Sequence, residues 1–235
     1  MKNLVVLTGA GISAESGIST FRDSDGLWEQ YRIEDVATLE AWYKDKALVT
    51  DFYNQRRMQL KTVKPNYGHI GLAELEKDFN VSIITQNVDN LHERAGSTNI
   101  VHLHGELTKV RSERYEELVY ELPEEKYEVK IGDLCKKGYQ LRPHIVWFGE
   151  AVPMMDKAVE ITENTDILLI IGTSLNVYPA AGLVHYVRPD VPIYVIDPKD
   201  VPVKRKNVIF IKKGASEGVK EFMKIMLETN RTRKN

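Results

Sequence analysis

Small residues with the spacing of a phosphate-binding turn follow the first apolar run of the chain. Gly9, Gly11 and Ala14 match the G-x-G-x-x-G/A pattern, which brings backbone N–H groups to a pyrophosphate where a helix begins. A tight strand-to-helix turn without a ligand can have the same spacing, so the pattern alone is a weak signal. A dehydrogenase also needs an acidic residue after a second strand about 20 residues later, but SDGLWEQYRIEDV (24–36) is no strand. The loop therefore suggests a dinucleotide without hydride transfer.

Polar residues also follow two other apolar runs. The segment TQNVDN (85–90) carries Gln86, Asn87 and Asp89, and a second segment is GTS (172–174). Amide and carboxylate side chains can hold ribose hydroxyls and a carboxamide, although a helix N-cap or a polar turn would use the same residues. Ligands of open α/β sheets bind beyond the carboxyl ends of the strands. Three such strand ends favour one shared cleft.

A pair of histidines in VHLHG (101–105) supplies a candidate base. On a strand, His102 and His104 face the same way, and Gly105 lets a substrate approach closely. Histidine can accept a proton near neutral pH. A buried or surface histidine without a catalytic role is the common alternative. A metal pair formed by His102 and His104 is a further alternative, but no third ligand is evident.

The elements that must position these residues alternate between short apolar runs and amphipathic segments. The predicted strands are Leu4–Leu7, Val81–Thr85, Ile100–Leu103, His144–Phe148, Asp166–Ile171, Pro192–Ile196 and Val208–Ile211. The predicted helices cover 47–62, 68–79, 154–165 and 179–187, and a last helix begins near Ser216. Several strands are apolar throughout, as in a parallel sheet covered on both faces. This alternation predicts an α/β fold with a doubly wound parallel sheet.

One region interrupts this alternation. Residues 108–141 are dense in Glu, Lys and Tyr, and ELVYELPEEKYEVK (117–130) predicts a hairpin of two short strands around Pro123-Glu124-Glu125. We therefore expect a small second lobe inserted in the sheet domain. The expected division is a small lobe of residues 28–67 and 108–141 and a sheet domain of residues 1–27, 68–107 and 142–235.

The overall composition excludes several classes of protein. The chain has 235 residues, a formal net charge of -2 and one cysteine. Because it has no basic field, we do not expect nucleic acid as a partner. The longest apolar runs, such as Ile167–Ile171, are the length of a strand, so we expect no membrane span, and Leu4–Leu7 is too short for a secretory signal. The lone Cys135 fits a reducing compartment. We expect a cytoplasmic monomer.

Five segments of the chain resemble a known family. GAGISAESGISTFR, TQNVDNLHERAG, HLHGEL, RPHIVWFGE and GTSLNVYPAA occur in the order found in sirtuins, the NAD-dependent protein lysine deacylases, and the resemblance to the bacterial type covers residues 4–225. It implies a Rossmann-like NAD-binding domain, a small lobe and a cleft between them. It also implies that NAD is consumed rather than reduced. This agrees with the absence of the second strand and acidic residue that a dehydrogenase needs. The implied products are nicotinamide, O-acyl-ADP-ribose and free lysine.

The resemblance implies roles for individual residues. His104 matches the general base that activates a ribose hydroxyl, and Asn87 is the second implied catalytic residue. The implied NAD contacts are Gly9, Ala10, Gly11, Ala14, Glu15, Phe21, Arg22, Gln86, Asn87, Asp89, His104, Gly172, Thr173, Ser174, Asp197 and Ala215. Val146, Phe148 and Gly149 match the segment that pairs with the substrate main chain as an added strand.

Tyr53 and Arg56 suggest the kind of acyl group. They are three residues apart and share one face of a helix, where a phenol and a guanidinium suit a carboxylate. From spacing alone, a solvated amphipathic helix is the commoner explanation. The segment 35–57 is similar, however, to the sirtuin subclass that removes succinyl and malonyl groups, with Ala37 and Ala41 at the small positions of a wide pocket. This resemblance implies an acidic acyl substrate, with acetyl as a further one.

The chain departs from the family at two places. Most sirtuins hold zinc with two Cys-x-x-Cys pairs, but here VRSER (110–114) has no cysteine and 134–137 has only Cys135. We therefore predict no zinc, and we expect the hairpin at 117–130 to organise the lobe instead. At the adenine ribose, Asp197 stands where the family usually has Asn, and Lys199 where it often has Glu. Asp197 can still accept hydrogen bonds from ribose hydroxyls. We expect Lys199 to alter the affinity for NAD but not the chemistry.

Two other functions remain as alternatives to deacylation. The chain could be an NAD-dependent protein ADP-ribosyltransferase, or a low-turnover NAD-binding sensor that has lost its zinc. Tyr53, Arg56 and the His104-Gly105 pair favour deacylation over the transferase. An intact His104 and Asn87 argue against a sensor.

Overall fold

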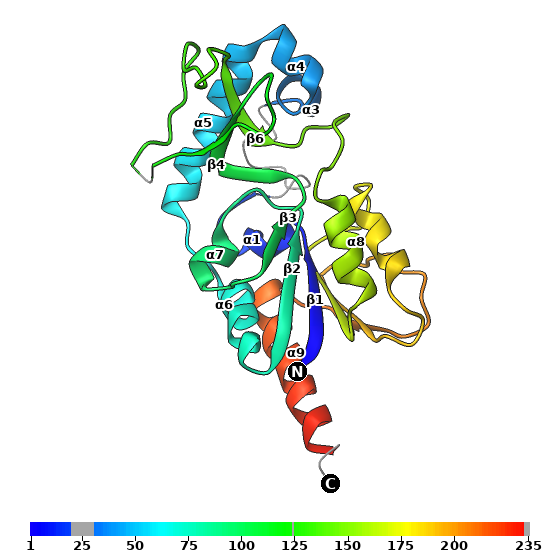
Figure 1. Cartoon of the computed structure of the whole chain (residues 1–235). Helices are drawn as coiled ribbons and strands as arrows, with labels where there is room; N and C mark the ends of the chain where they lie inside the picture. The colour runs from blue at the N-terminus through cyan, green and yellow to red at the C-terminus, as the bar shows by residue number, and fades with distance from the viewer. Residues whose placement is uncertain (20–30, 124, 233–235) are drawn as a thin grey trace.

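A parallel sheet of six strands forms the centre of the computed structural model, which describes residues 1–19, 31–123 and 125–232 (Figure 1). The strand order is β3-β2-β1-β7-β8-β9. The bounds are Lys2–Thr8 for β1, Phe79–Thr85 for β2, Ile100–His102 for β3, Ile167–Ile171 for β7, Ile193–Ile196 for β8 and Val208–Ile211 for β9. Strands β2 and β3, which follow β1 in the sequence, lie on one side of β1 in the sheet. Strands β7, β8 and β9 lie on its other side. The predicted doubly wound sheet is thus confirmed, and its order reverses between β1 and β7.

Alternate residues of β1 face two separate hydrophobic layers. Leu4 and Val6 pack in one cluster with α6 and α9, whereas Val5 and Leu7 pack in another with α8 and the 3₁₀ helix η2. Figure 1 shows α6 and α9 on one side of β1 and α8 on the other. Both faces are therefore covered, which explains the continuous apolar sequence of β1. The bounds are Tyr67–Glu74 for α6, Met155–Glu163 for α8, Ala180–Tyr186 for η2 and Ala215–Thr232 for α9.

Two predicted helices differ from the structure. The helix expected over 68–79 ends at Glu74 and continues as a single 3₁₀ turn, η1 (Leu75–Lys77). It cannot extend further because β2 already begins at Phe79. The segment expected as a helix over 179–187 is the 3₁₀ helix η2 rather than an α-helix.

A second, antiparallel sheet lies at the end of the molecule where α3, α4 and α5 gather (Figure 1). Its strand order is β5-β4-β6. The helices pack on it through a third hydrophobic cluster that includes Trp42, Phe52, Tyr53, Leu107 and Trp147. The bounds are Ile33–Val36 for α3, Leu39–Lys44 for α4, Lys46–Thr62 for α5, Gly105–Ser112 for β4, Val119–Glu121 for β5 and Leu141–Ile145 for β6.

The hairpin predicted within 117–130 is wrong. Its first run forms β5, but β5 pairs with β4 rather than with the second run, and residues 126–130 form no strand. The backbone of the second run finds another partner. Asn54 of α5 accepts from the Val129 N–H at 2.9 Å and donates to the Val129 carbonyl at 2.8 Å. One side-chain amide thus replaces a neighbouring strand. A strand was also predicted over His144–Phe148, but β6 ends at Ile145.

A buried cluster of charges joins β4, β6 and the segment after β6. Arg142 donates to both carboxylate oxygens of Glu150, at 2.8 and 2.9 Å, and Arg111 donates to one of them at 3.2 Å. The Trp147 backbone N–H donates to Glu150 at 2.8 Å. Burial alone would raise the pKa of Glu150, but the hydrogen bonds and charge of Arg142 hold it below its ordinary value. This charge cluster, and not the expected hairpin, connects the elements of the lobe.

Cys135 packs inside the same lobe. Its thiol is buried and donates to the Ser112 hydroxyl at 3.4 Å. Because the chain has no other cysteine, it lacks the four thiolates of the zinc site that is usual in the family it resembles.

We expect Glu150→Gln to destabilise the protein by about 3 kcal/mol, because two buried guanidinium groups lose their counter-charge while the side-chain shape is kept. Thermal or urea unfolding at pH 7 measures the change. Glu150 has a lowered pKa in the folded state, so its stabilisation is present above the unfolded-state value of 4.5 and is lost as the pH falls through the folded value. The two proteins should therefore converge in stability at acidic pH. Glu217→Gln, which removes an exposed ion pair with Lys220, is the matched control and should change little. Equal effects of the two substitutions would contradict this account.

Candidate active site

The turns that follow β1 and β7 touch at the point where the strand order reverses. The Gly9 N–H donates to the Ile171 carbonyl at 3.0 Å, and the Gly11 N–H donates to the Gly172 carbonyl at 2.9 Å. A Cβ on Gly11 would lie 2.6 Å from Gly172 Cα, and Gly172 has a φ of +61°. These glycines are therefore required by the contact between the two turns. Their N–H groups serve that contact, whereas the sequence pattern assigned them to a pyrophosphate.

The end of β2 joins the same group of turns. The Gln86 N–H donates to the Thr8 carbonyl at 2.9 Å, and the Gln86 side chain donates to the Thr173 hydroxyl at 3.0 Å. The polar residues after β1, β2 and β7 thus lie at one edge of the sheet. The structure therefore brings Gln86 and Thr173 together, as the sequence predicted.

A buried polar network lies below these turns. Asn87 donates to the Gly9 carbonyl at 3.1 Å and to the Ser13 hydroxyl at 3.2 Å, and Ser13 donates to Asp89 at 3.0 Å. The other carboxylate oxygen of Asp89 accepts from the Leu91 N–H. Burial raises the pKa of the Asp89 carboxyl. Asn87 and Asp89 are brought together as predicted, and Ser13 of α1 (Gly11–Ala14) is the residue that links them.

Sequence reasoning missed Ser13 and the buried histidine that supports it. The Asn66 N–H donates to His69 Nδ1 at 3.4 Å, so the neutral ring carries its hydrogen on Nε2, which lies 3.4 Å from the Ser13 hydroxyl. Burial lowers the pKa of His69 to about 4, which keeps the ring neutral. Donation therefore runs from His69 through Ser13 to Asp89. The available sequence signal was the position of His69 three residues after the helix cap Asn66.

His104 and His102 bind successive carbonyls of the loop after β2. His104 Nδ1 donates to the Gln86 carbonyl at 3.0 Å, and His102 Nδ1 donates to the Asn87 carbonyl at 3.1 Å. Burial lowers the pKa of His104, only partly opposed by its bond to Gln86. A neutral His104 with hydrogen on Nδ1 has a lone pair on Nε2, which is what a general base needs.

His102 has the opposite protonation tendency. Its Nε2 lies 2.7 Å from the carboxylate of Glu93 on α7 (Leu91–Ala95). Burial alone would lower its pKa, but the hydrogen bond and charge of Glu93 raise it. The candidate metal-binding group found among the described residues contains Glu93, His102 and Glu106, but not His104. Since Glu106 also pairs with Lys109 at 2.9 Å, the pair of histidines considered from the sequence is not brought together as a metal site.

The remaining predicted NAD contacts lie in different surroundings. Glu15 accepts from the Ser216 N–H at 3.2 Å, where α9 begins. Asp197 follows β8 and accepts from the Lys199 N–H at 2.8 Å. Ala215 is buried at the start of α9. Ala10 and Ala14 lie in and after the glycine turn, and Ser174 follows Thr173. Phe21 and Arg22 lie outside the described residues.

The predicted acyl-binding residues meet on α5 and in the cluster beneath it. Ala37, Ala41 and Tyr53 are buried in that cluster, and the half-buried Arg56 guanidinium lies 5.8 Å from the Phe52 ring centre and 5.9 Å from that of Tyr53. Burial raises the pKa of Tyr53, so its phenol stays protonated. The structure thus brings a phenol and a guanidinium together, as their spacing predicted.

The segment after β6 connects this cluster with His104. The Val146 N–H donates to the His104 carbonyl at 2.9 Å, and the Phe148 N–H donates to the Ala37 carbonyl at 3.0 Å. Phe148 is 47% exposed, and Gly149 turns the chain with a φ of +88°. The segment 146–149 therefore connects the candidate base with the candidate acyl-binding residues.

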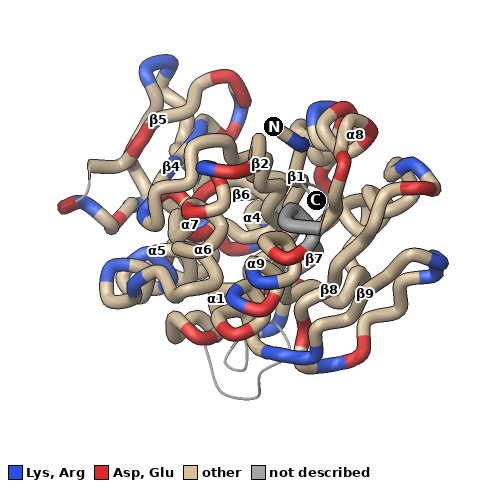
Figure 2. The backbone as a smooth tube through the Cα atoms, turned by 90° about the horizontal axis from the view of Figure 1, so that it is seen from below, with Lys and Arg blue, Asp and Glu red and all other residues tan. Residues whose placement is uncertain are grey.

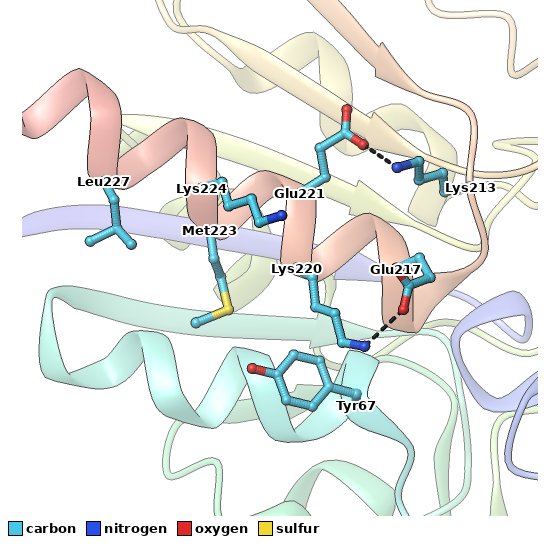
Figure 3. A pocket seen from close by; sticks show the side chains of 8 residues that line it. All are labelled: Tyr67, Lys213, Glu217, Lys220, Glu221, Met223, Lys224 and Leu227. Carbon is cyan, nitrogen blue, oxygen red and sulfur yellow. Dashed lines mark hydrogen bonds and ion pairs between the residues drawn. The ribbon is translucent and has the colours of Figure 1, made fainter.

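Other parts of the described surface differ from this site in their charges and lining. A hollow between α6 and α9 is lined by two ion pairs, Lys220 with Glu217 and Lys213 with Glu221, and by Lys224, and its lining contains none of the predicted site residues (Figure 3). Basic and acidic residues are interspersed along the chain (Figure 2). Among the described residues, no helix has the length and apolar composition needed to cross a bilayer.

Comparisons with known proteins agree with the resemblance. The family model described as Sir2 family matches residues 9–179. The chain is 62% identical to an NAD-dependent protein deacylase of Bacteroides thetaiotaomicron over 97% of this chain and 99% of that protein, and 54% identical to one of Helicobacter pylori over 97% and 99%. A solved Sir2 homolog in complex with NAD is 40% identical, covers 97% of this chain and 90% of its own, and superposes with a TM-score of 0.85.

We expect nuclear magnetic resonance titration to separate the two histidines. His104 should titrate below the ordinary value of 6.5 and carry its neutral-state hydrogen on Nδ1, whereas His102 should titrate above 6.5. In Glu93→Gln the pKa of His102 should fall, because burial remains while the carboxylate is lost. Glu76→Gln, which removes an exposed bond to Thr98, is the control. A His104 that titrates above 6.5 would contradict the assignment.

Proposed function

The chain belongs to the Sir2 family and is an NAD-dependent protein lysine deacylase, and we propose that it removes succinyl and malonyl as well as acetyl groups. The products are nicotinamide, O-acyl-ADP-ribose and free lysine. The observation that carries the acyl preference is the Arg56 guanidinium above the Tyr53 ring, next to a cluster that contains the small residues Ala37 and Ala41.

We propose that NAD is held at the edge of the sheet where β1, β2 and β7 end. The donor set there suits it, because Gln86 and Asn87 supply amides and Thr173 a hydroxyl at the reversal of strand order. We assign the other predicted contacts, from Gly9 to Ala215, to the same ligand. Gly9 and Gly11 would serve there as small residues that permit close approach, since their N–H groups are bonded to the carbonyls of Ile171 and Gly172. When bound, NAD supplies an electrophilic ribose carbon and the ADP-ribose group that carries the acyl group away. The chain's own task is to orient these groups and to move a proton.

His104 is the proposed general base. Its Nδ1–H is committed to the Gln86 carbonyl, so Nε2 is the atom that accepts a proton from a ribose hydroxyl. Its lowered pKa keeps it unprotonated at neutral pH. Asn87 is the second proposed catalytic residue, and Ser13 and Asp89 hold its side chain in one orientation.

The proposed peptide site is the segment that follows β6, residues 146–149. Val146, Phe148 and Gly149 would pair with the main chain of the substrate, so recognition depends little on the sequence around the lysine. The exposed Phe148 and its bond to Ala37 bring this segment close to the proposed acyl pocket. We further propose that the enzyme acts in the cytoplasm as a monomer, which agrees with its single cysteine and mixed surface charge.

The acyl pocket is tested by Tyr53→Phe and Arg56→Met. We expect each to lower kcat/KM for a succinyl-lysine peptide roughly ten- to hundredfold, because each removes a hydrogen bond or charge that a carboxylate needs. The effect on the same peptide with acetyl-lysine should be much smaller. Mass spectrometry of the released peptide, with NAD present, measures both rates.

Lys61→Met is the matched control, since it removes a charge from the same helix at a residue that contacts Tyr127 and Glu125 instead. It should leave both rates unchanged. Equal losses for succinyl and acetyl peptides in Tyr53→Phe and Arg56→Met would overturn the acyl preference. Nicotinamide release without acyl removal would favour the transferase or sensor alternatives.

A further inference from the structure

A hydrogen bond between Trp147 and Tyr53 fixes the direction of the Tyr53 hydroxyl. The Trp147 indole Nε1 lies 2.9 Å from the Tyr53 hydroxyl oxygen, and the two residues are only 2% and 1% exposed. An indole N–H can donate but cannot accept. The Tyr53 oxygen is therefore the acceptor in this pair, and its own hydrogen must point elsewhere.

That hydrogen has no acceptor within residues 1–19, 31–123 and 125–232, where Trp147 is the sole hydrogen-bonding partner of the Tyr53 hydroxyl. Buried tyrosine hydroxyls are normally satisfied as donors too. The raised pKa of Tyr53 means that the hydrogen is retained at neutral and mildly alkaline pH. The Arg56 guanidinium lies over the same ring and supplies a positive charge beside this donor.

Trp147 is itself held rigidly. The Arg142 guanidinium lies 3.5 Å from its ring centre, the Glu150 carboxylate accepts its backbone N–H at 2.8 Å, and the Trp42 ring packs at 5.7 Å. The buried charge cluster of the lobe therefore determines where the indole N–H points.

We propose that Trp147 is a positioning residue for acyl specificity, because its indole N–H occupies one side of the Tyr53 hydroxyl and directs the phenolic hydrogen toward an acyl carboxylate. This inference rests on the proposed function of Tyr53 and Arg56. An acidic acyl group supplies the acceptor that the hydroxyl lacks. An acetyl group brings no oxygen to that position, so the direction of the hydroxyl does not affect it.

Trp147→Phe tests the inference, because it keeps an aromatic ring and removes the N–H. We expect the ratio of kcat/KM for succinyl-lysine to kcat/KM for acetyl-lysine to fall about tenfold, the effect of one hydrogen bond to a charged group. Tyr67→Phe is the control, since it also keeps an aromatic ring and removes one side-chain hydrogen bond, to Glu74 at 2.9 Å, on α6 away from the acyl pocket. That ratio should not change in the control.

A double-mutant cycle separates positioning from a general packing role. In the Tyr53→Phe background, Trp147→Phe should have no further effect on the ratio, whereas in the Arg56→Met background it should still lower it. If Trp147→Phe folds poorly, replacing the Trp147 indole with the benzothiophene analogue keeps the ring size and removes only the N–H. The same fall in the ratio is then expected.

The outcomes distinguish the inference from the function on which it rests. If Tyr53→Phe leaves the ratio unchanged, the proposed acidic-acyl pocket is wrong. If Tyr53→Phe lowers the ratio, the pocket stands. The positioning role of Trp147 is then wrong if loss of the Trp147 N–H leaves the ratio unchanged in the unmodified protein. It is also wrong if that loss lowers the ratio further in the Tyr53→Phe background.

Discussion

The contact between the turns after β1 and β7 is the constraint on which the site depends. Gly11 and Gly172 approach so closely that neither can carry a Cβ without a shift of the backbone. This contact closes the sheet where its strand order reverses and fixes the start of α1, from which Ser13 reaches Asn87 and Asp89. A looser junction would leave the same polar residues at the ends of the strands but not in mutual contact.

The lobe depends on a different kind of interaction. Glu150 accepts from Arg142 and Arg111 in a largely buried setting, so two strands and the segment after β6 are connected through one carboxylate. The connection extends through Trp147 to Tyr53, which belongs to the proposed acyl pocket. The same side chains therefore support the lobe and orient Tyr53, the proposed specificity residue. The segment after β6, which bonds to His104 through Val146 and to Ala37 through Phe148, then connects this pocket with the candidate base.

Much of this arrangement could be predicted from the chain, for physical reasons that differ between residues. The sheet was predictable because strands buried on both faces must be apolar throughout, as Leu4–Leu7 is. The hairpin at 117–130 failed because its second run is satisfied by Asn54, a long-range partner that local propensity cannot indicate. Ser13 and His69 were missed since serine in a glycine turn and histidine near a helix cap have ordinary local explanations. Their roles arise only from the contacts made on folding.

The way the lobe is held has a consequence for the conditions that the enzyme tolerates. The guanidinium and carboxylate groups around Glu150 contain no sulfur, and the single thiol of the chain is buried against Ser112. Peroxide or loss of a transition metal, which dismantle a thiolate-bound lobe, have little to act on here. The contacts that hold this lobe would then depend on acidity, through the charge of Glu150, rather than on thiol oxidation state or metal supply.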